Sequence, residues 1–219
     1  MHPTPHSLTR DTLRGAVDHL AATDPRLGRI VGIHGPPPLW ARPGGFRTLG
    51  RIILEQQVSL ASAATLFRRL DRTIAGGMAA PAVADLGSAG LRRLGVTRQK
   101  ASYLASLAQR VAGGDLNLRS LARLNDADAA AKLTALHGVG PWSAGIYLMM
   151  ALRRPDIWPR GDLALHVALA RLRRQNRRPS SEEAARYAER WSPWRSVAAR
   201  ILWHEYLSNR PRRGAGDGG

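Results

Sequence analysis

The chain of 219 residues contains no cysteine, and its 33 basic residues include only two lysines, Lys100 and Lys132. The absence of cysteine excludes disulfides, thiol nucleophiles, cysteine-based zinc sites and cysteine-ligated iron–sulfur clusters. No apolar run approaches the roughly 18 residues of a membrane-spanning helix, and the start MHPTPHSLTR lacks the apolar segment of a secretory signal. We therefore expect a cytoplasmic protein that has no membrane partner.

Negative charge is scarce as well, because only 16 acidic residues oppose the basic ones and the formal net charge is +17. Such an excess predicts a polyanionic partner, either a phosphate backbone or an anionic lipid. Of these two, nucleic acid is the better fit, and a nucleoid-associated location follows from it.

Apolar residues recur at helical spacing along most of the chain, and the alternating β-branched runs typical of strands are missing. The pattern predicts an all-α fold, and a chain of this length can form one domain or two small lobes that share a cleft. The connector HGPPPLWARPGG breaks the helical pattern before residue 46, and the tail 209–219 is expected to be disordered. Predicted helices include about 9–22, 27–31, 98–112, 126–136, 142–152 and 181–190.

Two segments interrupt the helical pattern with residues that call for an explanation. In RIILEQQVSL the polar Glu55, Gln56 and Gln57 separate two apolar runs. They could form an exposed corner between two helices, or they could form a functional tip. In LHGVGPWSAG, Gly-Val-Gly joins two helical runs of the segment 126–152. The backbone N–H groups that open the second run could bind a phosphate irrespective of base sequence, or the segment could be an ordinary corner.

The segment LHGVGPWSA resembles the helix-hairpin-helix motif of the helix-hairpin-helix GPD DNA glycosylase superfamily. WPRGDLAL (158–165) resembles a loop of the same superfamily that ends in an aspartate, which is Asp162 in this chain. Asp162 follows Trp142 by 20 residues, the separation that the family pattern requires. ILEQQVSLASAA (53–64) and RYAERWSPWRSVAARILW (186–203) are similar to the 3-methyladenine DNA glycosylase II family within it. The matching segments run from about residue 42 to residue 207. The resemblance implies two helical lobes with a lesion-binding cleft between them. Residues 1–45 would share one lobe with the C-terminal helices of 161–208, and residues 46–160 would form the other.

The resemblance implies a hydrolase that breaks the N-glycosidic bond of alkylated bases, of the 3-methyladenine and 7-methylguanine type, in duplex DNA during base excision repair. Asp162 would be catalytic, because a carboxylate stabilises the positive charge that develops on the sugar. The alternative role for Asp162 is to cap its helix. Trp142 stands where bifunctional relatives carry a lysine nucleophile, which implies a monofunctional enzyme.

A cationic base is held best by aromatic faces, and Trp142 and Trp203 match aromatic pocket positions of the family. The family's tyrosines are replaced by Ile146 and Leu163, with Tyr147 one place away. Gln57 matches the side chain that fills the gap left by a flipped base, although a solvated corner is the competing interpretation. His166, one helical turn after Asp162, could tune that carboxylate or lie on the helix surface. Trp191 and Trp194 are expected to pack the C-terminal helices.

The resemblance also implies a set of DNA contacts, for which the candidates are Gln57, Gln56, His137, Gly138, Val139, Gly140, Ser143 and Arg195. The backbone carbonyls of Thr134, Leu136 and Val139 are candidates for holding a monovalent cation, Na⁺ or K⁺; no other cofactor is expected. We expect a monomer whose partner is duplex DNA containing alkylated bases. The alternatives are a non-catalytic helix-hairpin-helix module that binds DNA, and a glycosylase for mismatched or oxidised bases.

Overall fold

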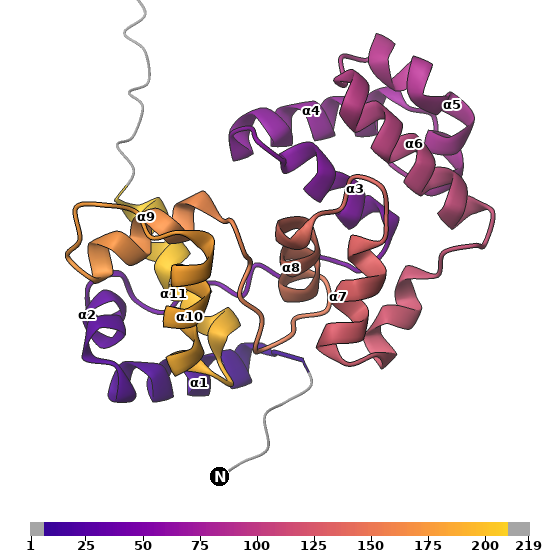
Figure 1. Cartoon of the computed structure of the whole chain (residues 1–219). Helices are drawn as coiled ribbons and strands as arrows, with labels where there is room; N and C mark the ends of the chain where they lie inside the picture. The colour runs from indigo at the N-terminus through magenta and orange to yellow at the C-terminus, as the bar shows by residue number, and fades with distance from the viewer. Residues whose placement is uncertain (1–6, 210–219) are drawn as a thin grey trace, which may run out of the picture. The chain divides into compact units, whose positions relative to one another are not determined.

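The computed structural model describes residues 7–209, and every regular element in that range is a helix (Figure 1). The all-α prediction is therefore confirmed. The chain divides into two compact units: unit 1 comprises Met1–Leu39 and Arg160–Gly219, and unit 2 comprises Trp40–Pro159. No helix within residues 7–209 has both the length and the apolar character needed to cross a lipid bilayer.

Unit 2 is a bundle built around a central apolar helix. Its elements are α3 (Phe46–Glu55), α4 (Leu60–Thr73), α5 (Ala80–Arg93), α6 (Arg98–Ala112), the 3-10 helix η1 (Leu118–Arg123), α7 (Asp126–Thr134) and α8 (Pro141–Met150). Helix α3 packs against α4, α6 and α8, and α7 packs against α8. Leu49, Ile52 and Ile53 of α3 are fully buried, which explains why this helix lies at the centre.

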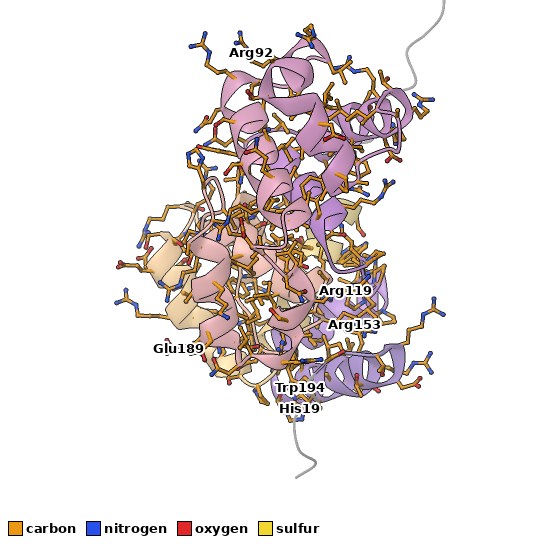
Figure 2. The ribbon with its side chains drawn as sticks, turned by 90° about the vertical axis from the view of Figure 1, so that its right-hand side faces the viewer. His19, Arg92, Arg119, Arg153, Glu189 and Trp194 are labelled. Atoms are coloured by element: carbon orange, nitrogen blue, oxygen red, sulfur yellow. The ribbon has the colours of Figure 1, made fainter. Side chains whose placement is uncertain are left out.

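Basic side chains extend from the surface of unit 2. Arg92 of α5, Arg119 of η1 and Arg153 after α8 are all exposed (Figure 2). Their positions on separate elements show that positive charge is spread over this unit, as a partner with many phosphates would favour.

Unit 1 joins the two ends of the chain. It contains α1 (Arg10–Thr23), α2 (Pro25–His34), α9 (Leu163–Leu172), α10 (Ser181–Ala188), the 3-10 helix η2 (Glu189–Trp191) and α11 (Arg195–Ser208). Helix α11 packs against α1, α2 and α9. The buried Arg200 of α11 donates from Nε to the Leu39 carbonyl at 3.0 Å, which ties the end of the N-terminal segment to the C-terminal helix.

The connector after the second helix divides between the two units, whereas the sequence placed all of it with the N-terminal lobe. Residues from Trp40 onward belong to unit 2. The Arg42 N–H donates to the Met150 carbonyl at 2.9 Å, and the Gly45 N–H donates to the Tyr147 hydroxyl at 2.8 Å. These hydrogen bonds attach the connector to α8. Of the predicted C-terminal tail, residues 210–219 lie outside the described part of the chain.

Side-chain caps account for most of the helix starts. Ser180 and Glu183 form the predicted capping box, and Asn125 caps α7. Helix α2 is longer than the predicted 27–31, because Asp24 caps its start and Pro25 occupies the first helical position. The polar segment between α3 and α4 is a turn between two helices.

Candidate functional site

Asp162 is the N-cap of α9 and is only 8% exposed. Its Oδ1 accepts the Leu165 backbone N–H at 2.9 Å and the Trp203 indole Nε1–H at 3.1 Å. Gly161 precedes it with a φ of +78°, a conformation that favours glycine. The capping role is thus present in the structure, and it gives the carboxylate a defined orientation at the positive end of a helix dipole.

The neighbours of Asp162 in unit 1 differ in exposure. Trp203, from α11, is 8% exposed, whereas Leu163, the first residue of α9, is 58% exposed. The side-chain Nε2 of His166 is buried and has no hydrogen-bond partner. Burial lowers the pKa of His166, while the negative charge of Asp162 acts to raise it and the positive charge of Arg178 to lower it. His166 therefore favours the neutral imidazole beside Asp162.

Two glycine positions shape the hairpin between α7 and α8. Gly138 has a φ of +83°, and a Cβ atom there would lie 2.1 Å from Cγ of Tyr103. Gly140 is the N-cap of α8 and Pro141 its first residue, and no side chain caps this helix. The first turn of α8 therefore presents backbone N–H groups and the positive end of its dipole, which is the arrangement that binds phosphates.

The other predicted hairpin residues lie on and beneath this turn. His137 is exposed and packs edge-on against the Tyr103 ring, with ring centres 4.6 Å apart. Val139 and Ser143 are buried. Among the carbonyls proposed for a cation, that of Leu136 accepts the Val139 N–H at 3.0 Å. Within residues 7–209, no three histidine, aspartate or glutamate side chains are grouped so that they could hold a metal ion.

The turn between α3 and α4 has a left-handed residue at its tip. Gln57 has a φ of +55°, which is uncommon for a residue other than glycine, and its side chain is exposed. Val58 and Leu60, which follow it, are 47% and 51% exposed. Sequence reasoning selected Gln57 but missed these two apolar neighbours, although their place directly after the polar interruption is visible in QQVSL.

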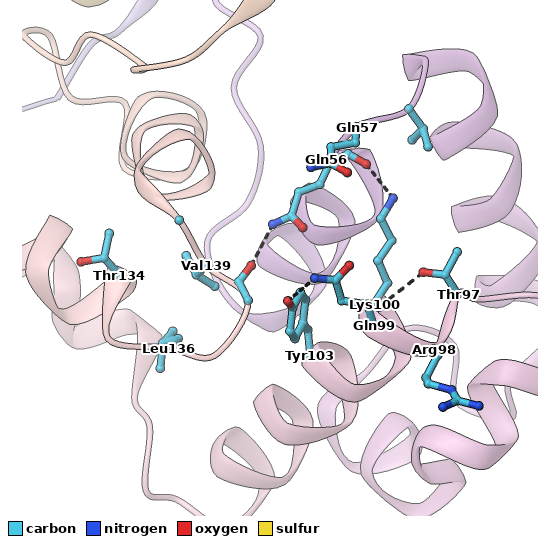
Figure 3. A pocket seen from close by; sticks show the side chains of 13 residues that line it. Gln56, Gln57, Thr97, Arg98, Gln99, Lys100, Tyr103, Thr134, Leu136 and Val139 are labelled. Carbon is cyan, nitrogen blue, oxygen red and sulfur yellow. Dashed lines mark hydrogen bonds between the residues drawn. The ribbon is translucent and has the colours of Figure 1, made fainter. Parts of the chain in front are cut away.

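A groove of about 730 Å³ in unit 2 brings this turn and the hairpin together. Its third wall is the start of α6, which sequence reasoning did not connect with the site. Figure 3 shows Gln56 reaching toward the hairpin and Lys100 reaching toward the turn. The groove is lined by Gln56, Gln57, Val58, Thr97, Arg98, Gln99, Lys100, Tyr103, Thr134, Leu136, Gly138, Val139 and Gly140.

The remaining candidates occupy more varied positions. Trp142 lies half-buried in the first turn of α8 in unit 2, and Arg195 is the half-buried first residue of α11 in unit 1. Ile146 is buried, and Tyr147 is completely buried with its hydroxyl accepting the Gly45 N–H. Burial raises the pKa of Tyr147. In this arrangement Tyr147 anchors the connector, and a role for it in binding a base stays a prediction.

Comparison with known proteins identifies the family to which the chain belongs. The model of the HhH-GPD superfamily of base excision DNA repair proteins matches residues 51–193, and the chain belongs to this superfamily. The chain is 33% identical over 121 residues to a DNA-3-methyladenine glycosylase of Bacillus subtilis, an alignment that covers 55% of this chain and 40% of that protein.

Two solved structures extend the similarity to the fold. A 3-methyladenine DNA glycosylase of Schizosaccharomyces pombe, in complex with abasic DNA, is 25% identical, with a TM-score of 0.77 over 86% of this chain and 95% of its own. A DNA-3-methyladenine glycosidase of Bacillus halodurans is 27% identical, with a TM-score of 0.71 over 87% of this chain and 88% of its own.

Proposed function

We propose that this protein is a monofunctional DNA glycosylase that releases alkylated bases, of the 3-methyladenine and 7-methylguanine type, from duplex DNA. The observation that carries the proposal is the Asp162 carboxylate, held by two N–H donors at the start of α9 in a member of a base excision repair superfamily. The choice of alkylated bases draws on the similar proteins, which are named 3-methyladenine glycosylases.

The chemistry needs little more than one oriented carboxylate. The bond between C1′ of the sugar and the base nitrogen breaks, and its electron pair leaves with the base. Because an alkylated purine already carries positive charge, it leaves neutral without being protonated by the protein. Positive charge then develops on the sugar, where the Asp162 carboxylate stabilises it. A water molecule aligned by Asp162 adds to C1′ and gives up a proton to that carboxylate, leaving a free base and an abasic site.

The strand itself should stay intact after base release, because neither lysine is a candidate nucleophile. Lys100 Nζ donates to the carbonyls of Leu54 and Gln56 at 2.8 and 2.7 Å, and Lys132 is an exposed residue of α7. The first turn of α8 carries Trp142 in place of a lysine. No Schiff base with the sugar is therefore part of the proposed reaction.

Duplex DNA is the proposed partner, held without regard to sequence. The uncapped first turn of α8 would bind a backbone phosphate. The carbonyls of Thr134, Leu136 and Val139 would hold a monovalent cation beside it, since carbonyl oxygen is a ligand for alkali cations and keeps a second lone pair when it accepts one N–H. Gln57, with the exposed Val58 and Leu60 behind it, would enter the space left by the flipped base.

Unit 1 contains a matched control for the role of Asp162. Asp24 caps α2, accepting the Arg26 N–H at 3.0 Å with one oxygen and the Trp191 indole N–H at 2.9 Å with the other. Asp162→Asn and Asp24→Asn therefore remove the negative charge from the same kind of cap, while the amide oxygen of asparagine can still accept the capping N–H. We expect Asp162→Asn to reduce release of 3-methyladenine from methylated duplex DNA at least about a hundredfold while its DNA affinity is unchanged, and Asp24→Asn to release base normally.

Three results would contradict parts of the proposal. Near-normal release by Asp162→Asn would remove that residue from catalysis. Tight DNA binding by the wild-type protein, without release of any base, would indicate a non-catalytic binding module. Release of an oxidised or mismatched base in preference to alkylated bases, in a panel of lesion-containing duplexes, would overturn the substrate class.

A further inference from the structure

The side chain of Gln56 connects the tip of one turn to the backbone of the hairpin. Its Nε2 donates to the Gly138 carbonyl at 2.8 Å and to Ser143 Oγ at 2.9 Å (Figure 3). One bond reaches the hairpin turn and the other reaches the first turn of α8. Both N–H groups of this amide are therefore used inside unit 2, so Gln56 links the α3–α4 turn directly to the phosphate-binding segment.

The backbone of the same residue is held from the opposite wall of the groove. Lys100 Nζ, at the start of α6, donates to the carbonyl of Gln56 at 2.7 Å and to that of Leu54 at 2.8 Å. These carbonyls lie at the C-terminal end of α3, where a cation is favoured by the helix dipole. Lys100 is half-buried, and burial lowers its pKa.

The third contact fixes the hairpin itself against α6. The Tyr103 ring lies so close to Gly138 that no Cβ could be accommodated, and the same ring makes an edge-on contact with the adjacent His137. The Tyr103 hydroxyl in turn accepts Gln99 Nε2–H at 2.6 Å. Helix α6 is thus the common support from which Lys100 holds the α3–α4 turn and Tyr103 holds the hairpin.

We infer that Gln56 is a positioning residue that keeps the exposed Gln57 at a fixed distance from the phosphate-binding hairpin. This inference rests on the proposed function, because it assigns Gln57 to the gap left by a flipped base. Gln57 follows Gln56 directly and has a left-handed backbone, so any shift of Gln56 changes the direction of the Gln57 side chain. Lys100 supports the same turn from its other side.

Gln56→Met tests this inference, because methionine is close to glutamine in shape but cannot donate either hydrogen bond. We expect the single-turnover release of 7-methylguanine paired with cytosine to slow at least about tenfold. Release of the same base from an unpaired bulge should change less than about threefold, since little flipping is needed there. Affinity for undamaged duplex should stay within about threefold, because the α8 amides are untouched.

A matched control and a second variant separate positioning from general destabilisation. Gln109→Met changes an exposed glutamine on α6 and should leave all three measurements unchanged. Lys100→Met loosens the turn without touching the hairpin and should reproduce the selective loss on the paired substrate. Both Gln56→Met and Lys100→Met are compared by thermal melting, so that a variant that fails to fold is recognised.

Each outcome bears on the inference. Equal slowing of release from the paired and bulged substrates in both variants would overturn it, as would wild-type release by Gln56→Met. The affinity ratio between a duplex with a tetrahydrofuran abasic analogue and an undamaged duplex provides a test that requires no catalysis. If the wild-type protein released no alkylated base, the proposed function would fail. Loss in Gln56→Met of the preference for the abasic-analogue duplex over the undamaged duplex would still support the positioning role.

Discussion

The hydrogen bond from Trp203 to Asp162 can be removed without removing the aromatic ring beside the carboxylate. Trp203→Phe deletes the indole N–H that lies 3.1 Å from Asp162 Oδ1. Trp191→Phe deletes the equivalent N–H that lies 2.9 Å from Asp24 Oδ2. Both indoles are buried, at 8% and 2% exposure, and both carboxylates cap a helix in unit 1. The two substitutions are therefore closely matched.

The expected losses follow from the strength of a hydrogen bond to a charged group. Such a bond contributes about 1.5–3 kcal/mol. For a chain of this size that corresponds to a fall in melting temperature of about 3–12 °C, to which the smaller phenylalanine ring adds a packing loss. If the bond holds Asp162 in its productive orientation, the same free energy should appear in the barrier, as a slowing of base release by about ten- to a hundredfold.

The assay is single-turnover release of base from methylated duplex DNA at saturating protein, with thermal melting of each variant alongside. Both variants should melt at lower temperature, and only Trp203→Phe should slow the release. Wild-type release by Trp203→Phe would show that the indole N–H does not orient the carboxylate for catalysis. Equal slowing by Trp191→Phe would show that the rate reports the stability of unit 1 as a whole.

Two further predictions concern unit 2. Gly138→Ala places a Cβ 2.1 Å from the Tyr103 ring at a φ of +83°, so we expect its Kd for undamaged duplex, measured by fluorescence anisotropy, to rise at least about tenfold. Gly15→Ala, on α1 with open space around it, should leave that Kd unchanged, and an unchanged Kd in Gly138→Ala would refute the hairpin assignment. The hydrogen bonds from Arg47 hold the pKa of the Asp71 carboxyl at about 2, below its usual 3.8. A carboxyl whose pKa is lowered by folding stabilises the fold fully above its usual pKa, and this stabilisation is lost as the pH falls through the lowered value. The difference in melting temperature between wild type and Asp71→Asn should therefore shrink as the pH falls from about 4 to about 2. A difference that does not shrink over this range would contradict this.

The helices could be predicted from the sequence because their signals are local. The apolar period and the capping residues, such as Ser180 with Glu183 and Asn125, act within one or two turns, and the structure confirms them. The assignment of residues 40–45 could not be predicted in the same way. It depends on hydrogen bonds from Arg42 and Gly45 to α8, which is distant in the sequence.

The candidate site shows the same difference between local signals and long-range contacts. The sequence selected Asp162 and Trp203 separately, and the structure joins them by a hydrogen bond. It also selected Gln56 as a DNA contact, whereas the structure directs its amide nitrogen into the protein. Lys100 carried no recognisable signal, because its importance comes from helix packing that brings α6 beside the end of α3. Long-range side-chain contacts of this kind leave no local pattern in a sequence.

An aspartate that caps a helix and accepts an indole N–H occurs twice among the described residues of unit 1, so that geometry alone does not define a catalytic residue. Asp24 lies between two consecutive helices, where its N–H bonds back to the Leu20 carbonyl at 2.9 Å while its side chain caps α2. Its position is accounted for by the fold. Asp162 instead follows a left-handed glycine at the end of a loop and precedes the exposed Leu163, which the packing of unit 1 does not require to be apolar. Asp162 thus stands at the end of a loop after a left-handed glycine, whereas Asp24 joins two consecutive helices, and this difference makes Asp24→Asn an informative control for Asp162→Asn.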